Sequence, residues 1–179
     1  MAVLPIARMG HPVLRQPAEV VADPTAPEIR QLVADMWETM VAARGRGIAA
    51  PQVYVPKRVV IFHAPLTDDA DRFDLSAQPL TVLINPVITF LSDEMALDWE
   101  GCLSVPGLRG VVPRDTHLRY QGVDLDGVPF EREATGFHAR VVQHECDHLD
   151  GWLYPQRMTD LSTLGYIDTL PTAAVAADD

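Results

Sequence analysis

The chain has 179 residues, of which 47% are hydrophobic, 22% charged and 7% aromatic, so it is long enough for one compact domain and too apolar for a disordered chain. The chain contains 14 Lys and Arg residues and 25 Asp and Glu residues, and the resulting formal charge of −11 disfavours binding to a phosphate backbone or an anionic lipid surface. No signal-peptide pattern and no run of 18 apolar residues occurs in the sequence, so we expect a cytoplasmic protein with no membrane and no specific nucleic-acid partner.

The first element that the sequence predicts is an amphipathic helix over residues 26–43. Its apolar residues recur at intervals of three and four positions and so share one face: Ile29, Leu32, Val33, Met36, Trp37, Met40 and Val41. Thr25 and Glu28 have the spacing of a capping box, and Gly45 is expected to provide permissive backbone at the C-terminal end. We expect this helix to pack alongside the rest of the domain through its apolar face.

Short strands dominate the middle of the chain. Runs rich in β-branched and apolar residues predict strands at 59–63, 81–90, 94–99 and 116–123. Asp126 and Gly127 predict a tight hairpin turn that leads into a strand over 128–133. The segment 65–79 carries four aspartates and is expected to be an acidic surface loop. Together these segments predict an antiparallel or mixed sheet.

A second helix is predicted over residues 135–149, and Asp150 and Gly151 are expected to end it. It carries apolar residues on several sides, which is typical of a helix enclosed by other elements. Residues 171–179 are mostly small and end in acidic side chains, so we expect a frayed tail. No repeat or linker divides the sequence, and we expect a single domain over residues 1–179.

The sharpest chemical signal lies on the second predicted helix, in the sequence HECDH at residues 144–148. On a helix, His144 and His148 lie four residues apart on one face, where both can bind the same metal ion. Glu145 then lies beside the open position of the metal and can act as general base toward a bound water. The motif favours a hydrolytic metal site over a pair of histidines that only make hydrogen bonds.

A catalytic metal usually takes three protein ligands, so a third ligand has to be found. The pattern that places a further histidine six residues after His148 fails, because residue 154 is tyrosine. No glutamate follows Glu145. The downstream carboxylates that remain are Asp150, Asp160 and Asp168, and Asp150 points elsewhere on a helix.

The third ligand is therefore expected upstream, where Cys102 is the best candidate. It lies in the sequence EGCLS, directly after a predicted strand and before a Val-Pro-Gly turn that can present a thiolate to the helix. The only other cysteine, Cys146, falls on the opposite side of the helix from the two histidines and is expected to be a small core residue. A disulfide between the two is disfavoured by the reducing compartment that we infer.

Three separated motifs follow one another along the chain: GRGIAAPQ at 45–52, EGCLS at 100–104 and QHECDH at 143–148. In this order and with these separations they resemble the peptide deformylase family, and the resemblance extends from the first helix through Leu153. It implies an α+β fold in which antiparallel or mixed strands surround the HExxH-bearing helix. It also implies that the chain removes the formyl group from the N-terminal methionine of nascent polypeptides and releases formate.

The resemblance assigns the metal centre residue by residue. It implies that Cys102, His144 and His148 hold one divalent metal, with Fe²⁺ as the physiological ion and Zn²⁺, Ni²⁺ or Co²⁺ as substitutes. The charge of such a metal lowers the pKa of a bound water, so that hydroxide is available near neutral pH.

The resemblance also assigns the groups that act on the substrate. Glu145 would accept the proton of the water and later deliver a proton to the departing amine. The side-chain amide of Gln52 and the backbone N–H of Leu103 would stabilise the negative charge that grows on the carbonyl oxygen.

Six further residues match family positions that contact the substrate: Gly47, Ile48, Arg109, Phe137, Arg140 and Val141. The first two would offer main-chain groups to an extended peptide, and Arg109 would reach toward the peptide beyond the methionine. The last three would form the pocket for the methionine side chain, with the stem of Arg140 covering the pocket and its guanidinium facing water.

Other positions brace the site or depart from the family. Glu100 and Arg114 match a pair that would support the metal centre from behind, and Asp147 would orient a neighbouring group. Arg46 stands where the family generally has an aliphatic residue, and Tyr54 stands where a glycine commonly follows the glutamine. Both are expected near the entrance of the site.

The implied partners are formyl-methionyl nascent peptides, together with a transient ribosome contact. Two other functions remain open from the residues: a related metal-dependent amidase or peptidase with a shifted substrate preference, and a noncatalytic metal-bound module. A panel of substrates distinguishes the amidase or peptidase from a deformylase. Glu145 and Gln52 argue against the second, because a closed structural site needs neither a general base nor an oxyanion donor.

Overall fold

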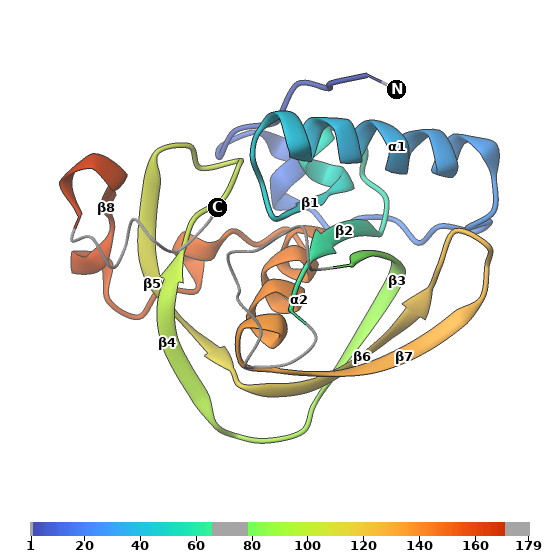
Figure 1. Cartoon of the computed structure of the whole chain (residues 1–179). Helices are drawn as coiled ribbons and strands as arrows, with labels where there is room; N and C mark the ends of the chain where they lie inside the picture. The colour runs from blue at the N-terminus through green and yellow to red at the C-terminus, as the bar shows by residue number, and fades with distance from the viewer. Residues whose placement is uncertain (1, 66–78, 171–179) are drawn as a thin grey trace.

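The structure is a computed structural model that describes residues 2–65 and 79–170. It combines two antiparallel sheets with two α-helices (Figure 1), which confirms the predicted mixed α+β class. Almost all of the segment predicted as an acidic loop, and all of the tail predicted to be frayed, lie outside the described residues. No helix among the described residues is long and apolar enough to cross a membrane.

The first helix, α1, spans Pro27–Ala42, close to its predicted bounds. Its N-cap is Ala26, and the predicted capping box is wrong, because the hydroxyl of Thr25 donates to Asp23 Oδ1 at 2.7 Å instead of capping the helix. Val41 belongs to the predicted apolar face but is 53% exposed. The buried residues of α1 are Ile29, Val33, Met36, Thr39 and Met40.

The C-terminal end of α1 also differs from the prediction. Arg44, and not Gly45, takes the left-handed conformation, with φ of 57°. The N–H of Gly45 donates to the carbonyl of Met40 at 2.9 Å and closes the last turn. Gly45 is required for space, because a Cβ there would lie 2.8 Å from Leu103 Cδ1. This glycine therefore brings the chain after α1 close to the segment that follows Cys102.

The larger sheet has five strands in the order β1-β2-β3-β6-β7, and all its neighbouring pairs are antiparallel. The short edge strand β1 was not expected, because three residues of a glycine-containing motif show no alternation. Gly127, with φ of 75°, forms the predicted turn between β6 and β7. The five strands are β1 (Gly47–Ala49), β2 (Val59–His63), β3 (Leu80–Phe90), β6 (His117–Val123) and β7 (Pro129–Thr135).

The smaller sheet has the order β4-β5-β8, formed by β4 (Met95–Glu100), β5 (Leu108–Asp115) and β8 (Gly165–Tyr166). The sequence did not indicate β5, because Pro113 and a glycine interrupt it. The proline is tolerated because β8 pairs only with the first two residues of β5, so at Pro113 the strand has a partner on one side alone.

The second helix, α2, spans Gly136–Leu149 and ends at Asp150, as predicted. It contacts β1, β2, β6 and β7 of the larger sheet and β5 of the smaller sheet, and Figure 1 shows it between them. Eleven of its residues are buried, which explains its apolar residues on several sides. Short 3-10 helices also occur at Pro12–Arg15, Ala50–Val53, Tyr154–Gln156, Leu161–Thr163 and Ile167–Thr169.

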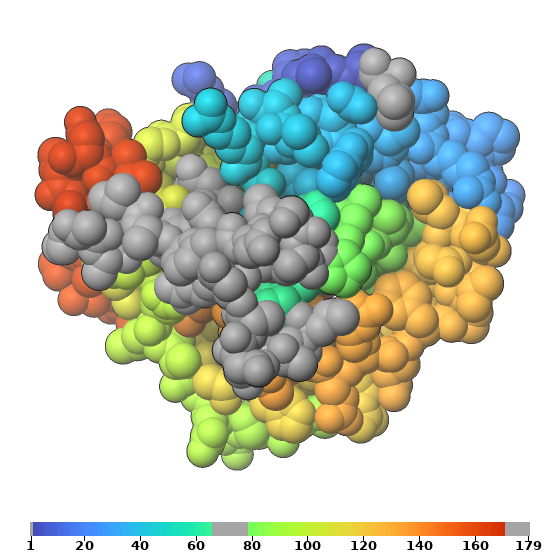
Figure 2. Space-filling view, in the orientation of Figure 1, coloured from blue at the N-terminus to red at the C-terminus, as the bar shows by residue number. Residues whose placement is uncertain are grey.

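The outer surface shows how α1 joins the sheet. In Figure 2, α1 lies along the upper edge, and β6 and β7 lie to the lower right of it. An ion pair of 2.7 Å joins Arg30 on α1 to Asp126 in the turn between β6 and β7. Both side chains are about half exposed or more, so this pair contributes little free energy and α1 depends on its buried face.

Candidate metal centre

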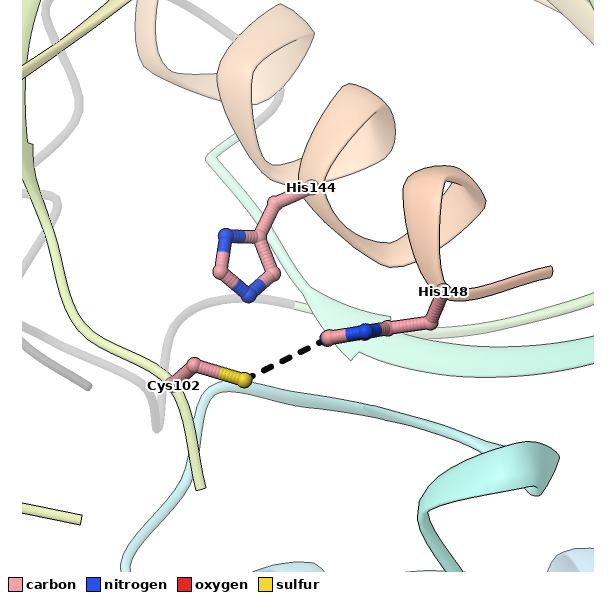
Figure 3. Close-up of side chains that lie close together, drawn as sticks. All are labelled: Cys102, His144 and His148. Atoms are coloured by element: carbon pink, nitrogen blue, oxygen red, sulfur yellow. Dashed lines mark hydrogen bonds between the residues drawn. The ribbon is translucent and has the colours of Figure 1, made fainter. Parts of the chain in front are cut away.

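Three side chains from two separate parts of the chain converge at one point inside the fold. His144 and His148 project from one face of α2 toward Cys102, which follows the end of β4 (Figure 3). One ligand atom from each of the three residues lies within 4.8 Å of the other two. Cys102 and His148 are 5% and 1% exposed, so solvent has little access to the cluster.

The cluster fits a metal ion by distance. In a tetrahedral site with bonds of about 2.0 to 2.3 Å, two ligand atoms lie about 3.3 to 3.8 Å apart. Cys102 Sγ lies 3.4 Å from His148 Nε2. Burial lowers the pKa of His144, but hydrogen bonds to Cys102 and Glu100 outweigh burial and hold that pKa well above its ordinary value. The pKa of His148 shifts the other way, well below its ordinary value, first because the ring is buried and then because of the charge of His144.

Glu100, the last residue of β4, fixes the orientation of one histidine. Its Oε2 lies 2.8 Å from His144 Nδ1, which leaves Nε2 of the ring for the cluster. Arg114 on β5 donates to both oxygens of this carboxylate, at 2.9 and 3.0 Å. Burial raises the pKa of Glu100, but Arg114 and His144 together hold it well below its usual range. Glu100 is therefore ionised.

A second carboxylate extends this network to the surface. Asp147 accepts a hydrogen bond of 2.6 Å from Arg114 Nη1 and two from Arg157, at 2.6 and 3.1 Å. The guanidinium of Arg157 also stacks over the ring of Trp152 at 4.7 Å. The sequence does not predict that Arg157 binds Asp147, because a solitary arginine beyond the helix gives no local signal of its partner.

The structure contradicts the predicted orientation of Arg140. Its guanidinium does not face water: it donates to Glu100 Oε1 at 2.8 Å and to the carbonyls of Val112 and Ala96 at 2.9 and 2.7 Å. The residue is only 4% exposed. The physical reason is that a buried carboxylate and two strand carbonyls lie within its reach, and a buried guanidinium needs such acceptors.

Glu145 lies at the same cavity as the cluster but makes different contacts. Its Oε2 is buried and has no hydrogen-bond partner among the described residues. Burial raises the pKa of Glu145 to about 7, although the charge of His144 acts in the opposite direction. A buried carboxylate oxygen without a partner is expensive, so it is typical of a group that is kept for chemistry.

Gly47 on β1 makes room for this carboxylate. A Cβ at position 47 would lie 2.6 Å from the carboxyl carbon of Glu145, well inside the contact distance. We expect Gly47→Ala to displace Glu145 and to lower the catalytic rate by about 10²-fold, the cost of misplacing a reacting group by about 1 Å. Steady-state kinetics of the variant and the wild type measure this effect.

Gly122→Ala on β6 is the matched control for that substitution, because a Cβ there would also crowd its neighbours, at 2.5 Å from Leu83 Cδ1. It should lower stability while the rate per folded molecule stays close to that of the wild type. Equal rates for Gly47→Ala and the wild type would show that the close approach of Glu145 to β1 has no role.

Gln52 has its amide oriented by two sets of contacts. Its Oε1 accepts the N–H of Ala49 at 2.8 Å, and its Nε2 donates to Ser104 Oγ at 3.2 Å and points to Cys102 Sγ at 3.5 Å. The donor end of the amide therefore lies beside the cysteine. Leu103 lies in the tight turn after Cys102 and lines the same cavity. The sequence does not indicate that the hydroxyl of Ser104 is a partner of Gln52, because the two residues are 52 positions apart in the chain.

The cavity beside the cluster has about 490 Å³ of empty space, its open mouth included. Phe137 and Val141 lie in its wall, where the sequence analysis expects them, and Trp99 is an additional wall residue. Arg46 also lines it, but it is 4% exposed rather than open at the entrance, with its guanidinium 4.9 Å from the centre of the Phe137 ring. The lining residues are Arg46, Gly47, Gln52, Trp99, Glu100, Gly101, Cys102, Leu103, Phe137, Arg140, Val141, His144 and Glu145.

Three expected residues lie outside that wall. Ile48 is completely buried beside Gly47 in β1 and is not among the residues that line this cavity. Arg109 is a buried residue of β5, and it is not one of the described residues that line this cavity. Tyr54 adopts the left-handed conformation, with φ of 67°, which explains why glycine suits that position, and its ring contacts His11 edge-on at 4.9 Å.

This combination of side chains around one cavity is typical of metal-dependent hydrolases. Comparison with known proteins gives the particular family. Residues 3–163 match the family model described as polypeptide deformylase. The chain is 54% identical to peptide deformylase 1 of Nitrosomonas europaea over 99% of both chains.

Solved structures agree with this match. A Met-Ala-Ser-bound class I type b peptide deformylase from Acinetobacter baumannii is 39% identical, covers 88% of this chain and 100% of its own, and has a TM-score of 0.77. An actinonin complex of the peptide deformylase from Ehrlichia chaffeensis is 34% identical, covers 91% and 92%, and has a TM-score of 0.80. The chain belongs to the peptide deformylase family.

Proposed function

We propose that this chain removes the N-formyl group from the formyl-methionine of nascent polypeptides with the residues gathered around Cys102, His144 and His148. Membership of the family supports the activity. The observation that carries the assignment of residues is the convergence of three ligand atoms within 4.8 Å beside Glu145, whose Oε2 is buried and has no partner among the described residues.

The proposed cofactor is one divalent ion per chain. One thiolate and two imidazoles suit Fe²⁺, which we propose as the physiological metal, and equally Zn²⁺, Ni²⁺ or Co²⁺ as substitutes. When bound, such an ion supplies a Lewis acid that makes water nucleophilic near neutral pH. Glu100 would keep His144 in the tautomer that leaves Nε2 for the ion, and Arg114 and Asp147 would hold Glu100 in place.

The remaining groups would act on the substrate directly. Glu145 would take the proton of the attacking water and deliver it to the departing amine. The amide of Gln52 and the backbone N–H of Leu103 would donate hydrogen bonds to the formyl oxygen as its negative charge grows. The fixed amide of Gln52 supports this role, because a donor that is already oriented costs no rearrangement during the reaction.

The substrate is proposed to bind as an extended strand. β1 is an edge strand, so the main-chain groups of Gly47 and Ile48 suit an extended peptide laid beside it. The methionine side chain would enter the cavity between Phe137 and Val141, and the Met-Ala-Ser peptide bound to the Acinetobacter enzyme is consistent with such a substrate. Arg109 would act farther along the peptide.

The setting of the reaction completes the proposal. We propose a single metallohydrolase domain over residues 1–179, in which α2 is the central HExxH-bearing helix and α1 packs alongside as an amphipathic helix. The reaction would occur in the cytoplasm. Contact with the ribosome would be transient, because a formal charge of −11 disfavours stable binding to RNA.

Metal removal tests the proposal. Protein purified without oxygen and loaded with Fe²⁺ should release formate from a formyl-Met-Ala-Ser peptide, should stop doing so after chelation, and should recover when Fe²⁺ is restored. A formylated peptide with another first residue and an unformylated peptide form the control panel. Hydrolysis of the control substrates alone would favour the alternative amidase or peptidase, and no hydrolysis with one metal per chain would favour a noncatalytic module.

A further inference from the structure

Arg140 contacts more of the framework around the metal cluster than a pocket residue needs to. It lies one helical turn before His144 on α2, so the two side chains share a face. Arg140 Nη1 lies 2.8 Å from Glu100 Oε1, and His144 Nδ1 lies 2.8 Å from Glu100 Oε2. Two side chains of α2 therefore bind both oxygens of the Glu100 carboxylate, and Glu100 lies two residues before Cys102.

The same guanidinium also reaches the two strands that flank the cysteine segment. It donates to the carbonyl of Ala96 on β4 at 2.7 Å and to that of Val112 on β5 at 2.9 Å. β4 ends just before Cys102, and β5 begins at Leu108. Arg140 thus ties the helix of the histidines directly to the pair of strands that presents the thiol.

Burial makes these contacts costly to replace. The side chains of Arg140 and Glu100 are 5% and 4% exposed, so a lost partner would not be exchanged for bulk water. Arg114 also binds Glu100, but it comes from β5 and bonds α2 at Asp147. Arg140 comes from α2 itself and bonds β4 at Ala96 and β5 at Val112 directly.

We propose that Arg140 is a positioning residue that holds the Cys102-bearing strand pair in register with His144 and His148. This inference rests on the proposed metal site. Arg140 also lines the cavity, but its guanidinium bonds Glu100 and the strands instead of facing water over the methionine pocket. A positioning role predicts that loss of Arg140 changes metal coordination, whereas a pocket role predicts a change in KM or in preference for the first side chain.

Cobalt binding distinguishes the two roles. The variants are Arg140→Met, which keeps an apolar stem without donors, and Arg140→Lys, which keeps the charge without the planar fork. We expect Arg140→Met to lower Co²⁺ affinity by about 10- to 100-fold, to alter the thiolate-to-cobalt absorption, and to lower kcat of the loaded enzyme while KM stays unchanged. Arg140→Lys should fall between this variant and the wild type, because one ammonium cannot reach all three acceptors in the fork geometry.

Arg58→Met is the matched control. Arg58 also bonds α2, at the carbonyl of Leu149 and the carboxylate of Asp150, but it does not touch Glu100 among the described contacts. It should keep the wild-type cobalt spectrum and affinity. If Arg140→Met does not fold, Arg140→Lys decides, and a wild-type spectrum and affinity in that variant would overturn the proposal.

Two further outcomes are decisive in different ways. A wild-type cobalt spectrum in Arg140→Met, with KM or the side-chain preference changed, would overturn the positioning role and restore the pocket role. A wild-type chain that gives no thiolate-to-cobalt absorption would overturn the proposed metal site itself, and the inference about Arg140 with it.

Discussion

Replacement of Glu145 by glutamine should abolish most of the deformylase activity while the metal stays bound. The substitution keeps the size of the side chain but removes its ability to accept a proton, and general-base catalysis contributes about 10²- to 10⁴-fold to a rate. Because Glu145 is not one of the three clustered ligands, metal content should remain at one ion per chain. The measurements are kcat for formate release and metal content of the same preparation.

Glu131→Gln on β7 is the control for that change. Glu131 lies on the exposed face of the outer hairpin, so the same chemical substitution there should leave kcat unaltered. A Glu145→Gln variant with full metal and a rate close to the wild type would contradict the base assignment. A variant that loses its metal would contradict it as well, because the defect would then be one of coordination.

The sequence predicts those elements whose signal is contained within the element itself. α1 and α2 show helical periodicity, and β2 is a continuous apolar run, so their bounds agree with the structure within a residue or two. β5 was missed because Pro113 and Gly110 are tolerated only through its pairing pattern with β4 and β8. That pairing is a long-range fact that no local window contains.

The candidate site divides in the same way. His144 and His148 lie four residues apart on one helix, a spacing that fixes their common face, and Glu145 is next to His144, so the HECDH motif can be recognised from the sequence alone. The direction of the Arg140 side chain cannot be predicted from the sequence in this way, because its acceptor Glu100 lies 40 residues earlier on another element. Arg157 and Ser104 were missed for the same reason, since their partners Asp147 and Gln52 are neighbours only in the folded chain.

Substitution of Cys102 by alanine should have the other large effect, through loss of the metal. Cys102 Sγ lies 3.4 Å from His148 Nε2, and Cys102 is the one member of this three-residue cluster that does not come from α2. Without it, two imidazoles remain, fewer than the three protein ligands of a typical catalytic site. We expect activity to fall by more than the 10- to 100-fold that loss of a supporting residue costs, and the thiolate-to-cobalt absorption to disappear.

Cys146, the second cysteine, provides a closely matched control for the substitution of Cys102. Cys146 is buried like Cys102, at 6% against 5% exposed, but it stands in the hydrophobic core cluster with Leu149 and Val142. Cys146→Ala should cost on the order of 1 kcal/mol of stability by leaving a small cavity, with metal binding and kcat retained. Because the two variants remove the same atom from equally buried positions, a difference in cobalt absorption isolates coordination from packing. Full cobalt binding by Cys102→Ala would show that the third ligand lies elsewhere.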